Sequence, residues 1–274
     1  MKKTFLVSQL GLDARPGVFE SLKTYGGQPF RFNEHLDRFF ESAKTVGLEV
    51  PETREKLRER VQKAFVESGK EDAFIRLTLV GDEIFVVVSE RKHALELYQK
   101  GVVLKTSAVR RNSSNSEFPE AKATVSFLNQ VLATLDPQPA GNYEILFLNP
   151  QGYLAEARIG NIFVVKDGTL LTPPPYGLLN GVTRRFVIEC ARFGRIRVEE
   201  KPLVRHDLFS ADEAFLTNTT WEILPIREVD GRRIGHEIPG SVTARLQKLF
   251  RKGVQQETRK IKSEKSKTRS RKRL

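Results

Sequence analysis

Strand-like apolar runs alternate with amphipathic helical stretches from residue 17 to residue 250, and one polar run, residues 110–116, interrupts them. Apolar runs such as 74–80 and 83–88, joined by a Gly-Asp turn, predict strands. Apolar residues at three- and four-residue spacing predict helices over 33–47 and 51–68. The order of these elements predicts a mixed α/β (α+β) chain of two domains with a cleft between them.

The same alternation continues after the polar run. We expect a helix over 123–135, strands at 143–148, 162–165 and 214–217, and a final helix over 241–250. The 274 residues are enough to give each of two domains its own core. The predicted division is a small amino-terminal α/β domain (1–109), an interdomain linker (110–118), a larger domain (119–250) and a basic tail (251–274).

The net charge of +12 is concentrated in that tail. Residues 251–274 hold eleven Lys and Arg against two Glu, a net of +9, which leaves +3 for the other 250 residues. A run with this charge and little apolar content is expected to be disordered and to bind polyanions weakly and without specificity. The alternative, a nucleic-acid-associated protein, therefore depends on the tail rather than on the folded body.

Cysteine content and hydropathy indicate the compartment. The single cysteine, Cys190, lies in an apolar helical stretch and excludes a disulfide framework. No run of eighteen apolar residues exists, and the apolar run after Met1 is too short for a secretory signal. We expect a cytoplasmic protein.

Four segments carry residues suited to one kind of chemistry. Lys122 follows the polar run at the start of an apolar helix, where desolvation at a domain junction would favour a neutral, nucleophilic amine. Gly181-Val182-Thr183 opens a helix whose free N–H groups can bind phosphate. A hydroxyl cluster, 217–220, ends a predicted strand, and Glu156 stands alone among apolar residues, where a buried carboxylate needs a cationic partner. Taken singly, these segments also fit a surface lysine, an ordinary helix start and a Thr-rich strand end.

The ordered set of segments resembles the fold-type IV (class IV) pyridoxal-phosphate (PLP) enzymes, which comprise branched-chain and D-amino-acid aminotransferases and aminodeoxychorismate lyase. The resemblance covers about residues 17–250. It rests on Val18-Phe19-Glu20, Glu34-His35-Leu36-Asp37-Arg38, Lys122, Glu156 with Asn161-Ile162-Phe163, Leu171-Thr172-Pro173-Pro174, Gly181-Val182-Thr183-Arg184, Ala211-Asp212-Glu213-Ala214-Phe215 and Thr217-Asn218-Thr219-Thr220.

The resemblance implies a role for each matching residue. Lys122 would form a Schiff base with the cofactor, pyridoxal 5'-phosphate, and carry the proton between the substrate Cα and the cofactor. Glu156 would pair with the pyridine nitrogen, and no metal is expected. The phosphate would be bound by Arg38, Val182, Thr183 and Thr219, which fits the need of a dianion for a cation and several donors.

The resemblance also implies a homodimer and a transaminase. The favoured reaction passes an amino group between an amino acid, with the branched-chain amino acids as candidates, and 2-oxoglutarate. Aminodeoxychorismate lyase is the alternative, with a D-amino-acid aminotransferase or a degenerate PLP-binding protein less favoured. The substrate would contact Arg76, Thr220 and Trp221, and Trp221 would narrow the pocket. Phe127, where the family often has an aromatic hydroxyl, and Arg158, where a small residue is usual, depart from the pattern.

Overall fold

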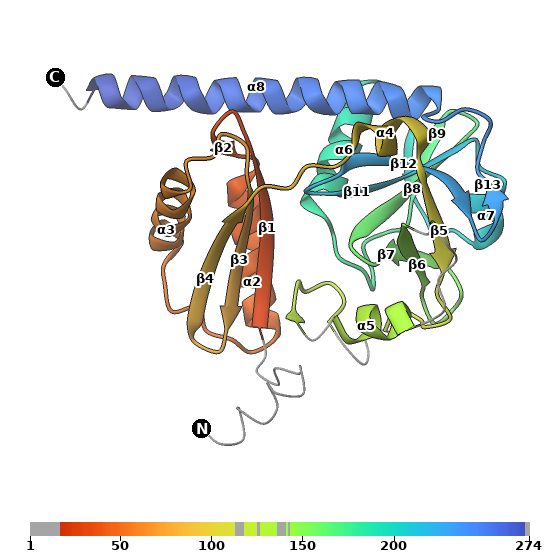
Figure 1. Cartoon of the computed structure of the whole chain (residues 1–274), viewed down its shortest axis with the longest axis horizontal. Helices are drawn as coiled ribbons and strands as arrows, with labels where there is room; N and C mark the ends of the chain where they lie inside the picture. The colour runs from red at the N-terminus through yellow and green to blue at the C-terminus, as the bar shows by residue number, and fades with distance from the viewer. Residues whose placement is uncertain (1–16, 113–117, 125–126, 136–140, 142, 272–274) are drawn as a thin grey trace, which may run out of the picture.

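The computed structural model describes residues 17–112, 118–124, 127–135, 141 and 143–271, without the side chains of 127, 128 and 264–271. It contains two sheets side by side, with helix α8 (Ser241–Arg271) lying along both (Figure 1). Mixed α/β content in two sheets agrees with the predicted fold class. Within the described residues, no helix combines the length and apolar composition needed to cross a lipid bilayer.

The small sheet is antiparallel, in the order β2-β1-β3-β4. Its strands are β1 (Gly17–Tyr25), β2 (Gln28–Pro29), β3 (Phe74–Val80) and β4 (Glu83–Ser89). Because strand side chains alternate between faces, one face presents apolar residues to helices α2 (Phe32–Thr45) and α3 (Arg54–Glu67). The other face carries Phe19, Ser21 and Arg76 toward the second sheet.

The large sheet has nine strands and closes on itself. Its order is β10-β9-β8-β11-β12-β5-β6-β7, with β7 also paired to β8, so six strands form a ring. Apolar side chains fill the inside of the ring. The strands are β5 (Val102–Thr106), β6 (Glu144–Leu148), β7 (Leu154–Ala157), β8 (Gly160–Lys166), β9 (Thr169–Thr172), β10 (Val198–Glu200), β11 (Glu213–Asn218), β12 (Glu222–Val229) and β13 (Arg232–Arg233), the last paired to β12.

Helices cover the outside of the ring and join it to the small sheet. Phe163 and Phe215 stack outward with ring centroids 5.0 Å apart, in a core shared with α6 (Val182–Phe193) and α8. Three shorter helices complete the fold: α4 (Leu95–Lys100), α5 (Phe127–Leu135) and α7 (Arg205–Phe209).

The structure moves the predicted domain boundary. The prediction that the small domain runs to residue 109 is wrong, because β5 pairs with β12 and β6 in the large sheet. The predicted linker is also bound to the large domain, because the backbone N–H of Arg111 donates to Leu148 O at 2.8 Å. Residues 113–117 of that linker lie outside the described residues. An apolar run predicts a strand but not the sheet that it joins, since pairing is non-local.

The chain then returns to the small sheet before α5. Ala123 forms a bridge with Val18, and Ala121 and Ala123 pack in the core of the small sheet. Of the predicted helix over 123–135, Ala123 is therefore not helical and Phe127–Leu135 forms α5, while residues 125 and 126 lie outside the described residues. Its first residues serve as an edge segment beside β1.

The prediction of a disordered tail from residue 251 is also wrong. Helix α8 continues past Phe250 to Arg271. Val254 is buried in the core with α6, and Glu257 pairs with Arg31 at 2.9 Å. Packing by buried Val254 and half-buried Ile261, together with the Glu257 ion pair, ties this part of the helix to the body, although the charge run alone predicts disorder.

We expect two carboxy-terminal deletions to separate these parts of α8. Deleting 251–274 removes buried Val254, whose burial contributes roughly 1.5–3 kcal/mol, and should lower the free energy of unfolding by at least that amount. Deleting 264–274, which contains almost no apolar residue, should leave it within about 0.5 kcal/mol of the full chain. Urea unfolding followed by circular dichroism measures both. Equal stability of the two truncated proteins would contradict this packing.

Candidate active site

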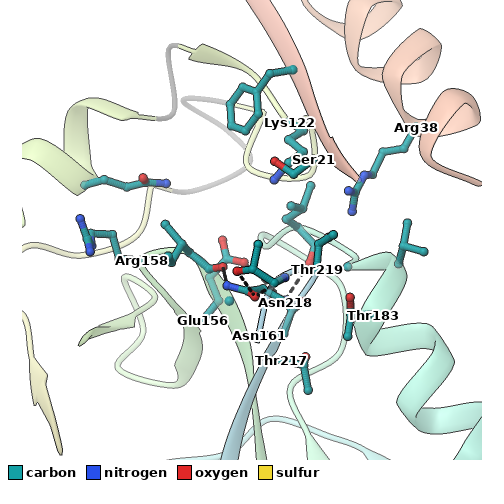
Figure 2. Close-up of a pocket in the computed structure, with 18 of the residues that line it drawn as sticks. Ser21, Arg38, Lys122, Glu156, Arg158, Asn161, Thr183, Thr217, Asn218 and Thr219 are labelled. Atoms are coloured by element: carbon teal, nitrogen blue, oxygen red, sulfur yellow. Dashed lines mark hydrogen bonds between the residues drawn. The ribbon is translucent and has the colours of Figure 1, made fainter. Parts of the chain in front are cut away.

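One cavity lies between the two sheets and collects most of the residues singled out in the sequence (Figure 2). Its upper wall in Figure 2 comes from α2, β1 and the segment around Lys122, and its lower wall from the large sheet and the start of α6. Of the predicted site residues, the wall contains Arg38, Arg76, Lys122, Glu156, Val182, Thr183, Thr219 and Thr220. Only Trp221 is missing from this set.

Lys122 is held by its backbone on the edge of the small sheet. Its carbonyl accepts from the N–H of Phe19 at 3.0 Å, and its own N–H donates to Ser42 Oγ at 3.0 Å. Its Nζ lies 4.7 Å from the centroid of the Phe19 ring. Burial, assisted by the positive charges of Arg38 and Arg76, lowers the pKa of Lys122 to about 8. A substantial fraction of this amine is therefore neutral near physiological pH.

Arg38 is fixed by a buried carboxylate on the neighbouring strand. Glu20 Oε1 accepts from Arg38 Nε at 2.6 Å, and Glu20 Oε2 accepts from Arg38 Nη2 at 2.9 Å. His35 Nδ1 also lies 2.7 Å from Glu20 Oε2. Burial by itself raises the pKa of Glu20, but Arg38 and His35 outweigh it and hold that pKa well below its ordinary value of 4.5. The remaining nitrogen, Arg38 Nη1, donates to Asn180 O at 3.1 Å and so reaches the other wall.

The first turn of α6 faces the cavity with free backbone donors. Gly181 is its N-cap, so no side chain accepts from the first N–H groups, and no acidic residue lies in the first turn. A Cβ at Gly181 would collide with the amide oxygen of Asn161. Asn161 Nδ2 in turn donates to Leu179 O at 2.8 Å, which holds the loop before α6 against β8. This geometry suits an anion with several oxygens.

Glu156 is buried in the cavity wall, next to Asn161. Its Oε1 lies 3.0 Å from Arg111 Nε, and its Oε2 lies 3.4 Å from Asn161 Nδ2. Burial raises its pKa, against the lowering effects of Arg111 and Lys122. A carboxylate in this setting can accept a hydrogen bond from a protonated ring nitrogen, whose positive charge would favour the ionised acid.

The turn after β11 is built around Asn218. Its Oδ1 accepts from the N–H of Thr220 at 2.9 Å and from the N–H of Trp221 at 2.7 Å. Thr219 and Thr220 are thereby presented to the cavity, and the buried Thr217 hydroxyl in its wall has no hydrogen-bond partner among the described residues.

Trp221 differs from the expectation that it narrows the pocket. Its ring is buried in the core of the large sheet, 5.8 Å from the ring of Tyr143, and is not part of the cavity wall. Adjacent residues of a strand-end turn point in different directions, so the neighbouring Thr220 does not predict where Trp221 lies. Arg158 does line the cavity, and its Nε donates to buried Glu144 at 3.0 Å. The side chain of Phe127 lies outside the described residues.

The site depends on three residues to which the sequence alone assigns no role. Glu20 and Asn161 fall inside the matching motifs, and Arg111 lies in a run that reads as a polar linker. The sequence does contain a signal for the role of Glu20, since a single acid in an apolar strand implies a buried cationic partner. Nothing in the sequence indicates the ion pair between Arg111 and Glu156, because the two residues are far apart in the chain.

The residues present fit the phosphate and ring nitrogen of the cofactor that the sequence implies. One guanidinium, the open start of α6, and hydroxyls including the unpartnered Thr217 Oγ1 form a cradle for a dianion. Lys122 and Glu156 line the same cavity from its two walls. The donor set therefore matches the group on chemical grounds.

Comparisons with known proteins point the same way. The family model described as amino-transferase class IV matches residues 17–229. The chain is 34% identical over 253 residues to a branched-chain-amino-acid aminotransferase of Pseudomonas aeruginosa, covering 85% of this chain and 82% of that protein. It is 36% identical over 256 residues to a putative branched-chain-amino-acid aminotransferase of Methanocaldococcus jannaschii, covering 88% of each.

Solved structures agree with the sequence relatives. A T.th. branched-chain amino acid aminotransferase with pyridoxamine 5'-phosphate superposes with a TM-score of 0.83 at 31% identity, covering 87% of this chain and 85% of that one. The Escherichia coli branched-chain amino acid aminotransferase gives a TM-score of 0.82 at 29% identity, covering 86% and 85%.

The Glu20 network predicts a pH-dependent effect of Glu20→Gln. Because the folded pKa of Glu20 is depressed, its stabilisation is present above its ordinary pKa of 4.5 and is lost as the pH falls toward the folded value. We expect Glu20→Gln to reduce the free energy of unfolding by about 3–5 kcal/mol near pH 7, since it leaves Arg38 buried without a carboxylate. That difference should shrink below about pH 4. Urea titrations of the wild type and Glu20→Gln at pH 7 and below pH 4 test this. The same difference in unfolding free energy at both pH values would contradict the depressed pKa of Glu20.

Proposed function

The chain belongs to the class IV aminotransferase family and is a PLP-dependent transaminase, and we propose that it passes an amino group between an amino acid and 2-oxoglutarate. The branched-chain amino acids are the first candidates for the amino donor, because the relatives above carry that name. The observation that carries the proposal is a half-buried lysine of lowered pKa in one cavity with an anion cradle and a buried carboxylate.

Lys122 is the covalent anchor in this proposal. A desolvated amine with a pKa of about 8 is neutral far more often than a surface lysine, so Lys122 would hold the cofactor covalently. The same Nζ can take a proton from the substrate Cα and return it nearby, because its pKa lies close to the working pH. The Phe19 ring beneath it excludes water from one side.

The cofactor would lie with its phosphate on the α6 side. Arg38, with the N–H groups of Val182 and Thr183 and the hydroxyl of Thr219, would bind the phosphate, and Glu156 would accept from the ring nitrogen. PLP supplies an electron sink for the electrons released at the substrate Cα. The protein contributes a pre-formed arrangement of charges: Glu20 fixes Arg38 and Arg111 fixes Glu156 before any ligand binds.

The substrate would lie between Arg76 of the small sheet and Thr220 of the large sheet, both of which line the cavity. Arg76 Nη1 donates to Ser21 Oγ at 3.2 Å, and its guanidinium lies 3.7 Å from the centroid of the Phe19 ring. A guanidinium held in this way is suited to a carboxylate. The lyase alternative uses the same residues, but the named relatives favour transamination.

Two further expectations belong to the proposal. Cytoplasmic location remains a prediction from the composition. Weak polyanion binding by the basic end of α8 is a second prediction from the composition. Deleting residues 264–274 should reduce the retention of the protein on heparin and leave cofactor binding unchanged.

The decisive experiment is the visible absorbance of the PLP-loaded protein beside a Lys122→Ala variant, with exposed Lys63→Ala as the matched control. We expect Lys122→Ala to reduce the amino-acid half-reaction by about 10²–10⁴-fold. The wild-type apoprotein should take up PLP faster as the pH rises, levelling off above about 8, because only the neutral amine reacts. A wild-type protein that takes up no PLP, or a Lys122→Ala variant as active as the Lys63→Ala control, would overturn the proposal.

We also propose a homodimer. Phe85 and Val87 of β4 are about half exposed, and Phe118 and Ile159 are similarly exposed. Exposed apolar residues of this size are typical of protein interfaces. Analytical ultracentrifugation should give about twice the mass of one chain, 31.2 kDa, and Phe85→Lys with Val87→Lys should shift the protein to a monomer. A monomeric wild-type protein at micromolar concentration would contradict this.

A further inference from the structure

The guanidinium group of Arg158 lines the cavity with nitrogens that the rest of the protein does not use. Arg158 lies in the turn between β7 and β8, and its backbone N–H donates to Ile145 O at 2.9 Å. Its Nε donates to Glu144 Oε1 at 3.0 Å, whereas its two Nη groups have no partner among the residues that the structure describes. An arginine tied through one nitrogen and free at two others can hold an anionic oxygen of a ligand.

Glu144 is a buried partner that restricts where the Arg158 guanidinium can lie. Its Oε1 also accepts from the N–H of Ile145 at 2.9 Å, and its buried Oε2 has no hydrogen-bond partner among the described residues. Burial raises the pKa of Glu144, and the positive charge of Arg158 acts in the opposite direction. The carboxylate at the start of β6 therefore fixes the Nε end of the guanidinium and leaves the Nη end to the cavity.

Three anchors fix which edge of a bound pyridine ring would face Arg158. In PLP the aldehyde carbon lies opposite the ring nitrogen, and the phosphate arm and the 3-oxygen lie on the two edges between them. With the phosphate at Arg38 and Thr183, the nitrogen at Glu156 and the aldehyde at Lys122, the 3-oxygen would lie on the edge turned away from α6. Figure 2 shows Arg158 on the far side of Glu156 from Arg38 and Thr183, which is the side of that edge.

The other donors near this edge are committed or uncharged. Asn161 Nδ2 donates to Leu179 O at 2.8 Å, and Arg111 pairs with Glu156. The amide of Gln130 lines the cavity but brings no charge. The 3-oxygen of the cofactor is an ionised phenol, and removing an ionised oxygen from water is unfavourable unless a donor, best a cation, faces it.

We propose that Arg158 binds the ionised 3-oxygen of the cofactor through its Nη groups and that Glu144 positions it there. The proposal rests on the cofactor-binding function above. Because a small residue is usual at this position in the family, the contact is particular to this chain. A cation beside the 3-oxygen favours the deprotonated form of the bound cofactor, so it lowers the pH at which the visible absorbance of the PLP-loaded protein titrates.

The first test compares pyridoxine 5'-phosphate with 3-deoxypyridoxine 5'-phosphate, which lacks only the 3-oxygen. Isothermal titration calorimetry measures the binding of each to the apoprotein, and neither ligand has an aldehyde with which Lys122 could react. The proteins are the wild type, Arg158→Met, Arg158→Lys and a control, Arg197→Met. Arg197 is an exposed arginine of the large domain that pairs with Glu199 at 2.6 Å and does not line the cavity. Circular dichroism checks the fold of each variant.

We expect Arg158→Met to weaken the binding of pyridoxine 5'-phosphate by about tenfold or more, the lower range for a hydrogen bond to a charged group. The same variant should weaken the binding of the 3-deoxy ligand by less than about threefold. Arg158→Lys should retain part of the preference, because an ammonium keeps the charge without the planar fork, and Arg197→Met should match the wild type. An equal loss on both ligands would overturn the contact.

The second test is a pH titration of the visible absorbance of the PLP-loaded protein. Arg158→Met should raise the apparent pKa of that absorbance by about one to two pH units, because loss of the cation favours the protonated form. The other charged groups around the cofactor, Arg38, Arg111, Lys122 and Glu156, are present in every variant, so the change reports residue 158. An apparent pKa that is the same in Arg158→Met and in the wild type would contradict the contact.

The proposed function and the Arg158 contact fail in different ways. A wild-type protein that binds neither phosphate ester and takes up no PLP overturns the cofactor-binding role of the cavity, and the contact with it. A wild-type protein that takes up PLP and binds both esters equally well, with binding unchanged in Arg158→Met, overturns the contact alone and leaves the transaminase intact.

Discussion

The buried carboxylate of Glu20 is the interaction on which the site depends. It accepts from Arg38 and contacts His35, so two residues of α2 are fixed against β1 by one charge. Removing three ionisable groups from water is unfavourable unless each is paired, and here the geometry pairs them. The remaining guanidinium nitrogen of Arg38, Nη1, then donates across the cavity to Asn180 O. A charge from the small domain is thereby aimed at the loop that opens α6, before any ligand is present.

The cavity exists because the two sheets are held side by side by contacts outside it. Arg31 pairs with Glu189 of α6 and with Glu257 of α8, and its guanidinium lies 4.4 Å from the centroid of the Phe186 ring. Lys23 and Tyr25 of β1 bind Glu222 of β12. These contacts connect the domains on the side of α8, which lies along both in Figure 1. Rigid positioning matters because small displacements of a reacting group reduce rates strongly.

The charges in the cavity are divided between paired and unpaired groups. Paired arginines keep a fixed orientation and favour the ionised form of their partners, as Arg111 does for Glu156 against the larger effect of burial, which raises the pKa of that acid. Arg76 and Arg91 line the cavity without a carboxylate within ion-pair distance among the described residues. A site that combines both kinds can hold a phosphate, a ring nitrogen and a substrate carboxylate in separate places. Excess positive charge also attracts anionic ligands from solution.

The sequence by itself determined the element types, the two-domain α/β class and the ordered motifs that bring Arg38, Lys122, Glu156 and Thr183 to one family pattern. These features are local, because helix and strand periodicities and short motifs are set by neighbouring residues. The tertiary structure alone decided that β5 joins the large sheet, that Arg111 pairs with Glu156, that Trp221 packs inward and that α8 continues past Phe250. Each of these depends on residues far apart in the chain, whose pairing is chosen by global packing and not by local pattern.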